Sequence, residues 1–64
     1  EGVLMVTGDL VKFKFTFELA SGTLIKPGEL GIIKSKAMWY IYVLHVNSGE
    51  CITVKEANVK KLEI

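Results

Sequence analysis

Residues 38–46 read MWYIYVLHV, and this stretch decides the fold class. It contains neither glycine nor proline, and its β-branched and aromatic residues favour an extended strand. Both of its alternating faces are apolar, so periodicity alone does not say which face a sheet would bury. The sequence NSGE follows at residues 47–50 and predicts a hairpin turn into a partner strand at residues 51–55.

A second strand is predicted over residues 10–19, where apolar and polar side chains alternate. The even positions are polar from 12 to 18, and the apolar set on the odd positions is Val11, Phe13, Phe15, Phe17 and Leu19. This period of two is typical of a strand with one buried and one solvated face.

Shorter elements fill the rest of the chain. Residues 23–26 are extended, and Pro27 with Gly28 fits the two central positions of a type II turn. Residues 30–34 form a further strand, in which Gly31 indicates a bulge or a close backbone approach. One helical turn at residues 56–59 precedes a last strand at 60–64, so the chain is predicted to be all-β with five strands.

Four segments resemble the SH3-like small barrels. Residues 8–13 (GDLVKF) resemble the opening strand, and residues 28–33 (GELGII) resemble the second element with the glycine pattern of the KOW-type branch. Residues 42–50 resemble the central hairpin, and residues 54–62 resemble the strand, short 3₁₀ turn and final strand. The resemblance implies a five-stranded barrel over residues 8–64, preceded by an extension or extra strand at 1–7. It also implies a binding module for proteins or RNA.

The composition argues against enzymes and large sites. The 64 residues suffice for one small domain, and eight lysines without arginine give a formal net charge of +1. Cys51 is the single cysteine and His45 the single histidine, and neither has a suitable partner nearby in sequence. We therefore predict no catalytic residue, metal or cofactor, and no small-molecule substrate. No stretch approaches the roughly 20 apolar residues of a membrane span, and a cytoplasmic protein, of bacterial or phage origin, is expected.

The register of the central hairpin decides which face of residues 38–46 is free. A two-residue turn would place His45 beside Ile52 in the core, whereas a three-residue turn with a glycine bulge would place Tyr42 and Leu44 there. The three-residue turn is preferred because it keeps histidine out of the core.

That register leaves an apolar stripe outside the barrel, made of Trp39, Ile41, Val43 and His45. Three interpretations are open: residues 3–6 or the end of the 10–19 strand cover this stripe, the stripe is an interface for a partner protein or a second copy of the chain, or it is simply exposed. Protein–protein interaction or subunit assembly is accordingly the first functional hypothesis.

A second hypothesis concerns lysines that neighbouring strands would bring together. They are Lys12, Lys14, Lys34, Lys36, Lys60 and Lys61. With Trp39 or Tyr40 close by, such a face would combine cations with a stacking surface and bind RNA or single-stranded nucleic acid weakly. The other interpretation is a solvated face whose lysines prevent edge pairing.

Overall fold

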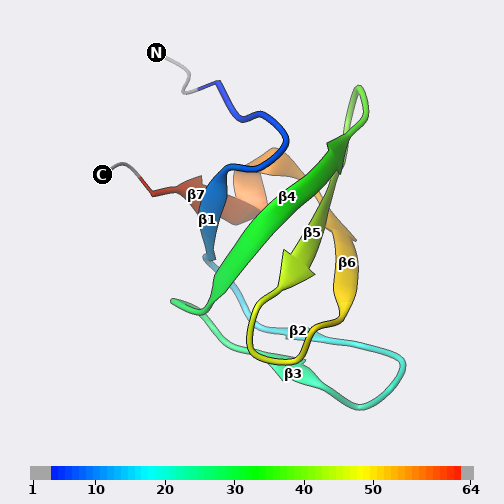
Figure 1. Cartoon of the computed structure of the whole chain (residues 1–64). Coiled ribbons are helices and arrows are strands. Elements are labelled where there is room, and N and C mark those ends of the chain that lie inside the picture. The colour runs from blue at the N-terminus through cyan, green and yellow to red at the C-terminus, as the bar shows by residue number, and fades with distance from the viewer. Residues whose placement is uncertain (1–3, 63–64) are drawn as a thin grey trace.

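The computed structural model describes residues 4–62. This part of the chain contains seven strands and one 3₁₀ turn (Figure 1). The elements are β1 (Leu10–Phe13), β2 (Phe17–Glu18), β3 (Leu24–Ile25), β4 (Leu30–Lys36), β5 (Ile41–His45), β6 (Cys51–Val54), the 3₁₀ turn η1 (Glu56–Asn58) and β7 (Val59–Lys61). The all-β prediction is confirmed, and so is the short 3₁₀ turn before the last strand.

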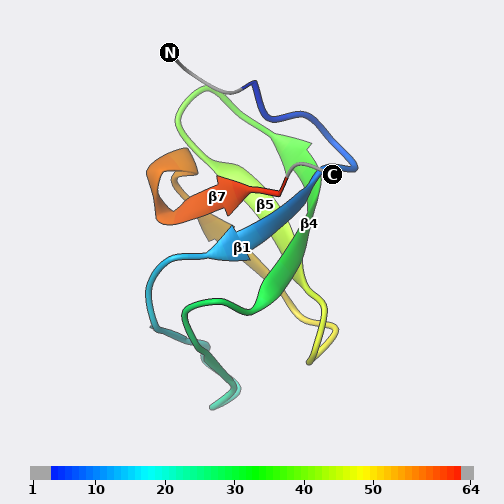
Figure 2. The same cartoon turned by 90° about the vertical axis from the view of Figure 1, so that its left-hand side faces the viewer.

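The main sheet has five antiparallel strands in the order β6-β5-β4-β1-β7, and β2 and β3 form a separate pair. In Figure 2, β1 and β7 lie in front of β5 and β6, with β4 linking the two halves. Within residues 4–62, β6 and β7 are the two edges of the sheet and do not pair with each other, so the strand order is open.

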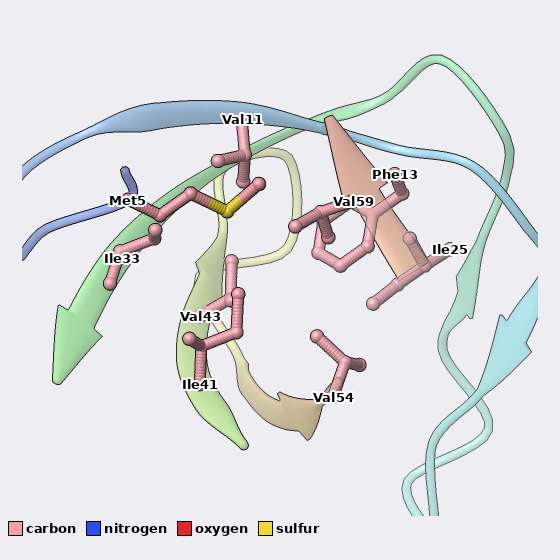
Figure 3. Packing of buried hydrophobic residues seen from close by; sticks show 9 residues of the cluster. All are labelled: Met5, Val11, Phe13, Ile25, Ile33, Ile41, Val43, Val54 and Val59. Atoms are coloured by element: carbon pink, nitrogen blue, oxygen red, sulfur yellow. The ribbon is translucent and has the colours of Figure 1, made fainter. Parts of the chain in front are cut away.

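The hydrophobic core fills the space between the two halves of the sheet (Figure 3). Strands β1, β4, β5, β6 and β7 each contribute inward side chains, and Ile25 of β3 closes one end. The buried apolar residues are Met5, Val11, Phe13, Ile25, Ile33, Ile41, Val43, Val54 and Val59. Phe17, Leu19 and Ile52 are partly buried against this cluster.

The single strand predicted over residues 10–19 is wrong. The chain pairs in the main sheet only as far as Phe13, whose N–H donates to the carbonyl of Glu29. It then leaves the sheet and returns through the β2–β3 hairpin, in which Phe17 pairs with Ile25. Phe15 lies between the two strands and is 54% exposed, although its place in the alternation matched that of the buried Phe13.

The predicted turn at Pro27-Gly28 and the predicted close approach at Gly31 are confirmed. Gly28 has a φ of +93° and the Glu29 N–H donates to the carbonyl of Lys26, as a type II turn at Pro27-Gly28 requires. A Cβ atom on Gly31 would lie 2.5 Å from Cγ1 of Val43, which confirms the close approach. The irregularity in β4 lies elsewhere, because the pairing register with β5 shifts between Ile33 and Ser35.

The first described residues form no strand, yet they contribute to the core. Met5 is buried, and its carbonyl accepts a hydrogen bond of 2.7 Å from Nζ of Lys36. Nζ of Lys61 donates to the carbonyl of Leu4 at 3.2 Å. Residues 1–3 of the predicted N-terminal extension, and residues 63–64 of the predicted last strand, lie outside the described residues. The described part of the chain holds no helix with the length and apolar character of a membrane span.

Candidate functional site

The predicted stripe on the long central strand is largely buried. Ile41, Val43 and His45 are 1%, 0% and 2% exposed and face the core, so they cannot form a partner interface. Trp39 is 73% exposed, but it lies in the connection between β4 and β5 rather than on a strand.

The reason is a hairpin longer than either alternative considered. The N–H of His45 donates to the carbonyl of Glu50, so residues 46–49 form the loop. Ile41 therefore pairs with Val54 and Val43 with Ile52, and the odd positions point inward. The preferred register is wrong, and the face that it assigned to the core is the outer face of the sheet.

His45 is buried because both of its ring nitrogens have partners. Nε2 lies 2.6 Å from Oε1 of Glu29, and Nδ1 lies 2.7 Å from Oγ of Ser48. The ring also packs edge-on against Phe13, with the ring centroids 5.9 Å apart. Ser48 lies only three residues along the chain and was overlooked as a partner, whereas Glu29 is brought in only by the tertiary fold.

These hydrogen bonds form a continuous chain from one turn to another. With the Nε2 proton donated to the Glu29 carboxylate, Nδ1 accepts from the Ser48 hydroxyl, whose oxygen accepts the N–H of Glu50 at 3.2 Å. The hydrogen bond from His45, followed by one from the Lys26 backbone, holds the pKa of Glu29 below its ordinary value. The network thereby ties the turn before β4 to the turn before β6.

Serine, histidine and a carboxylate joined by hydrogen bonds also occur in nucleophilic sites. The imidazole is 2% exposed, and no cavity opens onto it anywhere in residues 4–62. Nor do the described residues contain a group of three or more His, Cys, Asp or Glu side chains that could hold a metal ion.

The free apolar surface lies on the opposite side of β5. Leu10 is opposite Ile32, Ile32 is opposite Leu44, and Leu44 is opposite Cys51. These four half-buried residues form a straight row across β1, β4, β5 and β6. Tyr42, 45% exposed, borders the row on the same face. We call these five residues the outer-face patch; the even-numbered set on β5 was the signal for it in the sequence.

The six predicted lysines divide into two groups. The side chains of Lys36 and Lys61 form ion pairs with Glu56 at 3.1 Å and with Asp9 at 3.4 Å. Lys12, Lys14, Lys34 and Lys60 are exposed and show no ion pair within the described residues. Lys12 and Lys60 are directly opposite each other on β1 and β7, which confirms that these strands are neighbours.

The described acids are mostly engaged inside the molecule. Besides Asp9, Glu29 and Glu56, Glu50 accepts hydrogen bonds from the hydroxyls of Ser21 at 2.7 Å and Thr23 at 2.6 Å. These two bonds, that of Thr23 first, hold the pKa of Glu50 below its ordinary value. No acidic residue occupies the strands of the main sheet, so the lysines on its outer face are not neutralised there.

Comparisons of the chain with protein-family models, with curated proteins and with solved structures find no match.

Proposed function

We propose that this chain is a non-catalytic binding module, most closely of the SH3-like type, that binds a protein partner through its outer-face patch. Three features support the SH3-like assignment: β1 lies between β4 and β7, a 3₁₀ turn precedes β7, and β4 is shared by both halves of the sheet. A protein partner, rather than a small molecule, fits a chain whose described part offers no cavity.

The observation that carries the proposal is the continuity of the apolar row. Leu10, Ile32, Leu44 and Cys51 are cross-strand neighbours, so their side chains form one row across four adjacent strands. Contiguous apolar surface of this kind marks contact sites more often than scattered exposed residues do. Lys12 and Lys34 flank it, so the surface has an apolar centre and a charged rim, the usual anatomy of an interface.

The test introduces a charge at the centre of the patch. A photo-crosslinking amino acid at position 42 identifies the partner in cells, and the purified partner is then titrated against the wild type and against Leu44→Lys. We expect Leu44→Lys to weaken binding at least about tenfold, since a desolvated, unpaired charge at an interface centre costs more than 1.4 kcal/mol.

Ala57→Lys is the matched control. Ala57 is exposed in η1, so this substitution adds the same charge away from the patch. Equal binding of the wild type and Leu44→Lys would contradict the assignment of this surface. Failure to crosslink any protein from position 42 would contradict it as well.

A second function is supported by the opposed lysines. Like charges directly opposite each other in a sheet destabilise it by roughly 0.2–1 kcal/mol, and an anion bound over Lys12 and Lys60 would remove this repulsion. Tyr42 on the same face offers a ring for base stacking. The chain is thus also a candidate for weak binding of RNA or single-stranded DNA.

Titration with a labelled oligonucleotide decides this point. Binding should fall steeply between low and physiological salt, and the double variant Lys12→Gln/Lys60→Gln should reduce that salt dependence. No binding even at low salt would remove the nucleic-acid hypothesis and leave the protein-binding one unaffected.

A further inference from the structure

The two edges of the main sheet differ sharply in composition. Strand β7 reads VKK, and lysines on an edge discourage pairing with another strand. Strand β6 reads CITV and carries no charge and no proline. It also lacks a register shift against β5, so neither charge, nor proline, nor a bulge protects this free edge.

The hydrogen-bonding groups that β6 leaves free can be assigned from the ladder. Residues 45 and 50 are a hydrogen-bonded pair, because the His45 N–H donates to the Glu50 carbonyl at 2.7 Å. Hydrogen-bonded and non-hydrogen-bonded pairs alternate in an antiparallel ladder. Ile52 and Val54 therefore bond to β5, while the N–H and C=O groups of Cys51 and Thr53 point away from the sheet.

The free edge is accessible. Within residues 4–62 no strand pairs with β6 on the side away from β5, and Figure 1 shows β6 at the outer margin of the sheet. The loop between β2 and β3 bonds to the residue before the strand, where the hydroxyls of Ser21 and Thr23 donate to the side chain of Glu50.

We propose that β6 is a dimerisation edge, which pairs antiparallel with β6 of a second copy of this chain. A twofold axis that passes midway between the Ile52 residues of the two copies places Cys51 opposite Thr53 of the second copy, and Thr53 opposite its Cys51. Both pairs bring outward-facing groups together, so each exchanges two main-chain hydrogen bonds. The two five-stranded sheets then become one continuous antiparallel sheet.

A second copy suits this edge because the edge is complementary to itself. Its free groups lie two residues apart, so the twofold arrangement satisfies all of them at once. The strand is uncharged, so the arrangement opposes no like charges, whereas self-pairing of β7 would bring Lys60 and Lys61 of both copies together. The apolar row also reaches Cys51, so the outer-face patches of both copies would meet at the junction.

The first test removes one donor at the edge. Thr53→Pro deletes an N–H that faces away from β5, so the β5–β6 ladder keeps its bonds and proline is tolerated as on other edge strands. We expect the wild type to be a dimer in sedimentation equilibrium, and Thr53→Pro to raise its dissociation constant roughly tenfold or more, since two hydrogen bonds are lost per dimer.

The second test fixes the register and does not depend on how well the proline variant folds. Thr53→Cys places a new thiol opposite Cys51 of the second copy, with Cα atoms about 5.5 Å apart, within the range that a disulfide spans. Under mild oxidation we expect a covalent dimer. Lys55→Cys is the control, because it adds an exposed thiol two residues further along the chain, just after β6. This variant should stay monomeric on a non-reducing gel.

A wild-type chain that stays monomeric at every concentration would overturn the proposal. So would a dimer that Thr53→Pro leaves intact and Leu44→Lys dissociates, because that dimer would be formed by the outer face. The proposal concerns the edge of the sheet, so it can fail while the outer-face patch still binds a different protein, and the crosslink from position 42 tells the two apart.

Discussion

The two faces of β5 are alike in composition and opposite in environment. Ile41, Val43 and His45 point inward and are almost fully buried, whereas Tyr42 and Leu44 point outward. Hydropathy ranks histidine below tyrosine or leucine as a core residue, yet the histidine face is the buried one. The difference teaches that a polar side chain enters a core when the fold satisfies its hydrogen bonds, here through Glu29 and Ser48.

The strongest way to break this contrast is to place the same charge on each face. Val43→Lys buries an unpaired ammonium in the core, and we expect a loss of about 3–5 kcal/mol, a large part of the roughly 5–15 kcal/mol that holds a domain folded. Leu44→Lys, one residue away on the outer face, should cost less than about 1 kcal/mol. Urea unfolding followed by circular dichroism measures both, and similar losses would show that the outer face is also buried.

A smaller effect is expected where β4 passes closest to the inner face of β5. Gly31→Ala would set a Cβ atom 2.5 Å from Cγ1 of Val43 and 3.0 Å from Cε2 of Phe13. Overpacking of this kind costs typically 1–3 kcal/mol.

The double variant Gly31→Ala/Val43→Ala is the informative control for this contact, because it removes the methyl group that the new atom meets. Its loss in unfolding free energy should be smaller than the sum of the two single losses. Strict additivity would mean that the clash at Val43 is not what destabilises Gly31→Ala.

The smallest effect is a change in pH dependence. The pKa of Glu29 in the folded chain lies below its ordinary value of 4.5, so its bond to His45 stabilises the fold above that pH. This stability is lost as the pH falls below 4.5 through the lower folded-state pKa. Glu29→Gln should flatten the acid limb of a plot of unfolding free energy against pH. Glu50→Gln is the comparison variant, because the pKa of Glu50 is also lowered but by hydrogen bonds from Thr23 and Ser21 rather than from His45.

An acid limb that Glu29→Gln leaves unchanged would contradict the role given to the His45 bond.

The sequence-based predictions succeeded where local chemistry decides the structure. The turn at Pro27-Gly28, the close approach at Gly31 and the 3₁₀ turn before β7 depend on backbone preferences of neighbouring residues. The alternation over residues 10–19 predicted the burial of Val11 and Phe13 correctly. It could not show that the chain leaves the sheet after Phe13, because that depends on bonds to residues 28, 29 and 58.

The candidate site was less predictable. The two wrong predictions about it, for His45 and for two of the lysines, both involve partners that are distant in sequence. His45 was assigned to the surface because Glu29, 16 residues away, could not be recognised as its partner. Lys36 and Lys61 were grouped with the free lysines because their pairing with Glu56 and Asp9 depends on the folded β-sheet. The lysine-face hypothesis required the first and last strands to be neighbours, and the pairing of Lys12 with Lys60 meets that condition.

The position of β1 in the sheet has a consequence for the order in which the protein folds. β1 precedes the other described strands along the chain, but it lies between β4 and β7, and Val11 pairs with Lys61. One side of β1 therefore stays open until almost the whole domain has left the ribosome. Such a high sequence separation slows folding, typically to milliseconds or longer, and makes the arrival of β7 the step that completes the sheet.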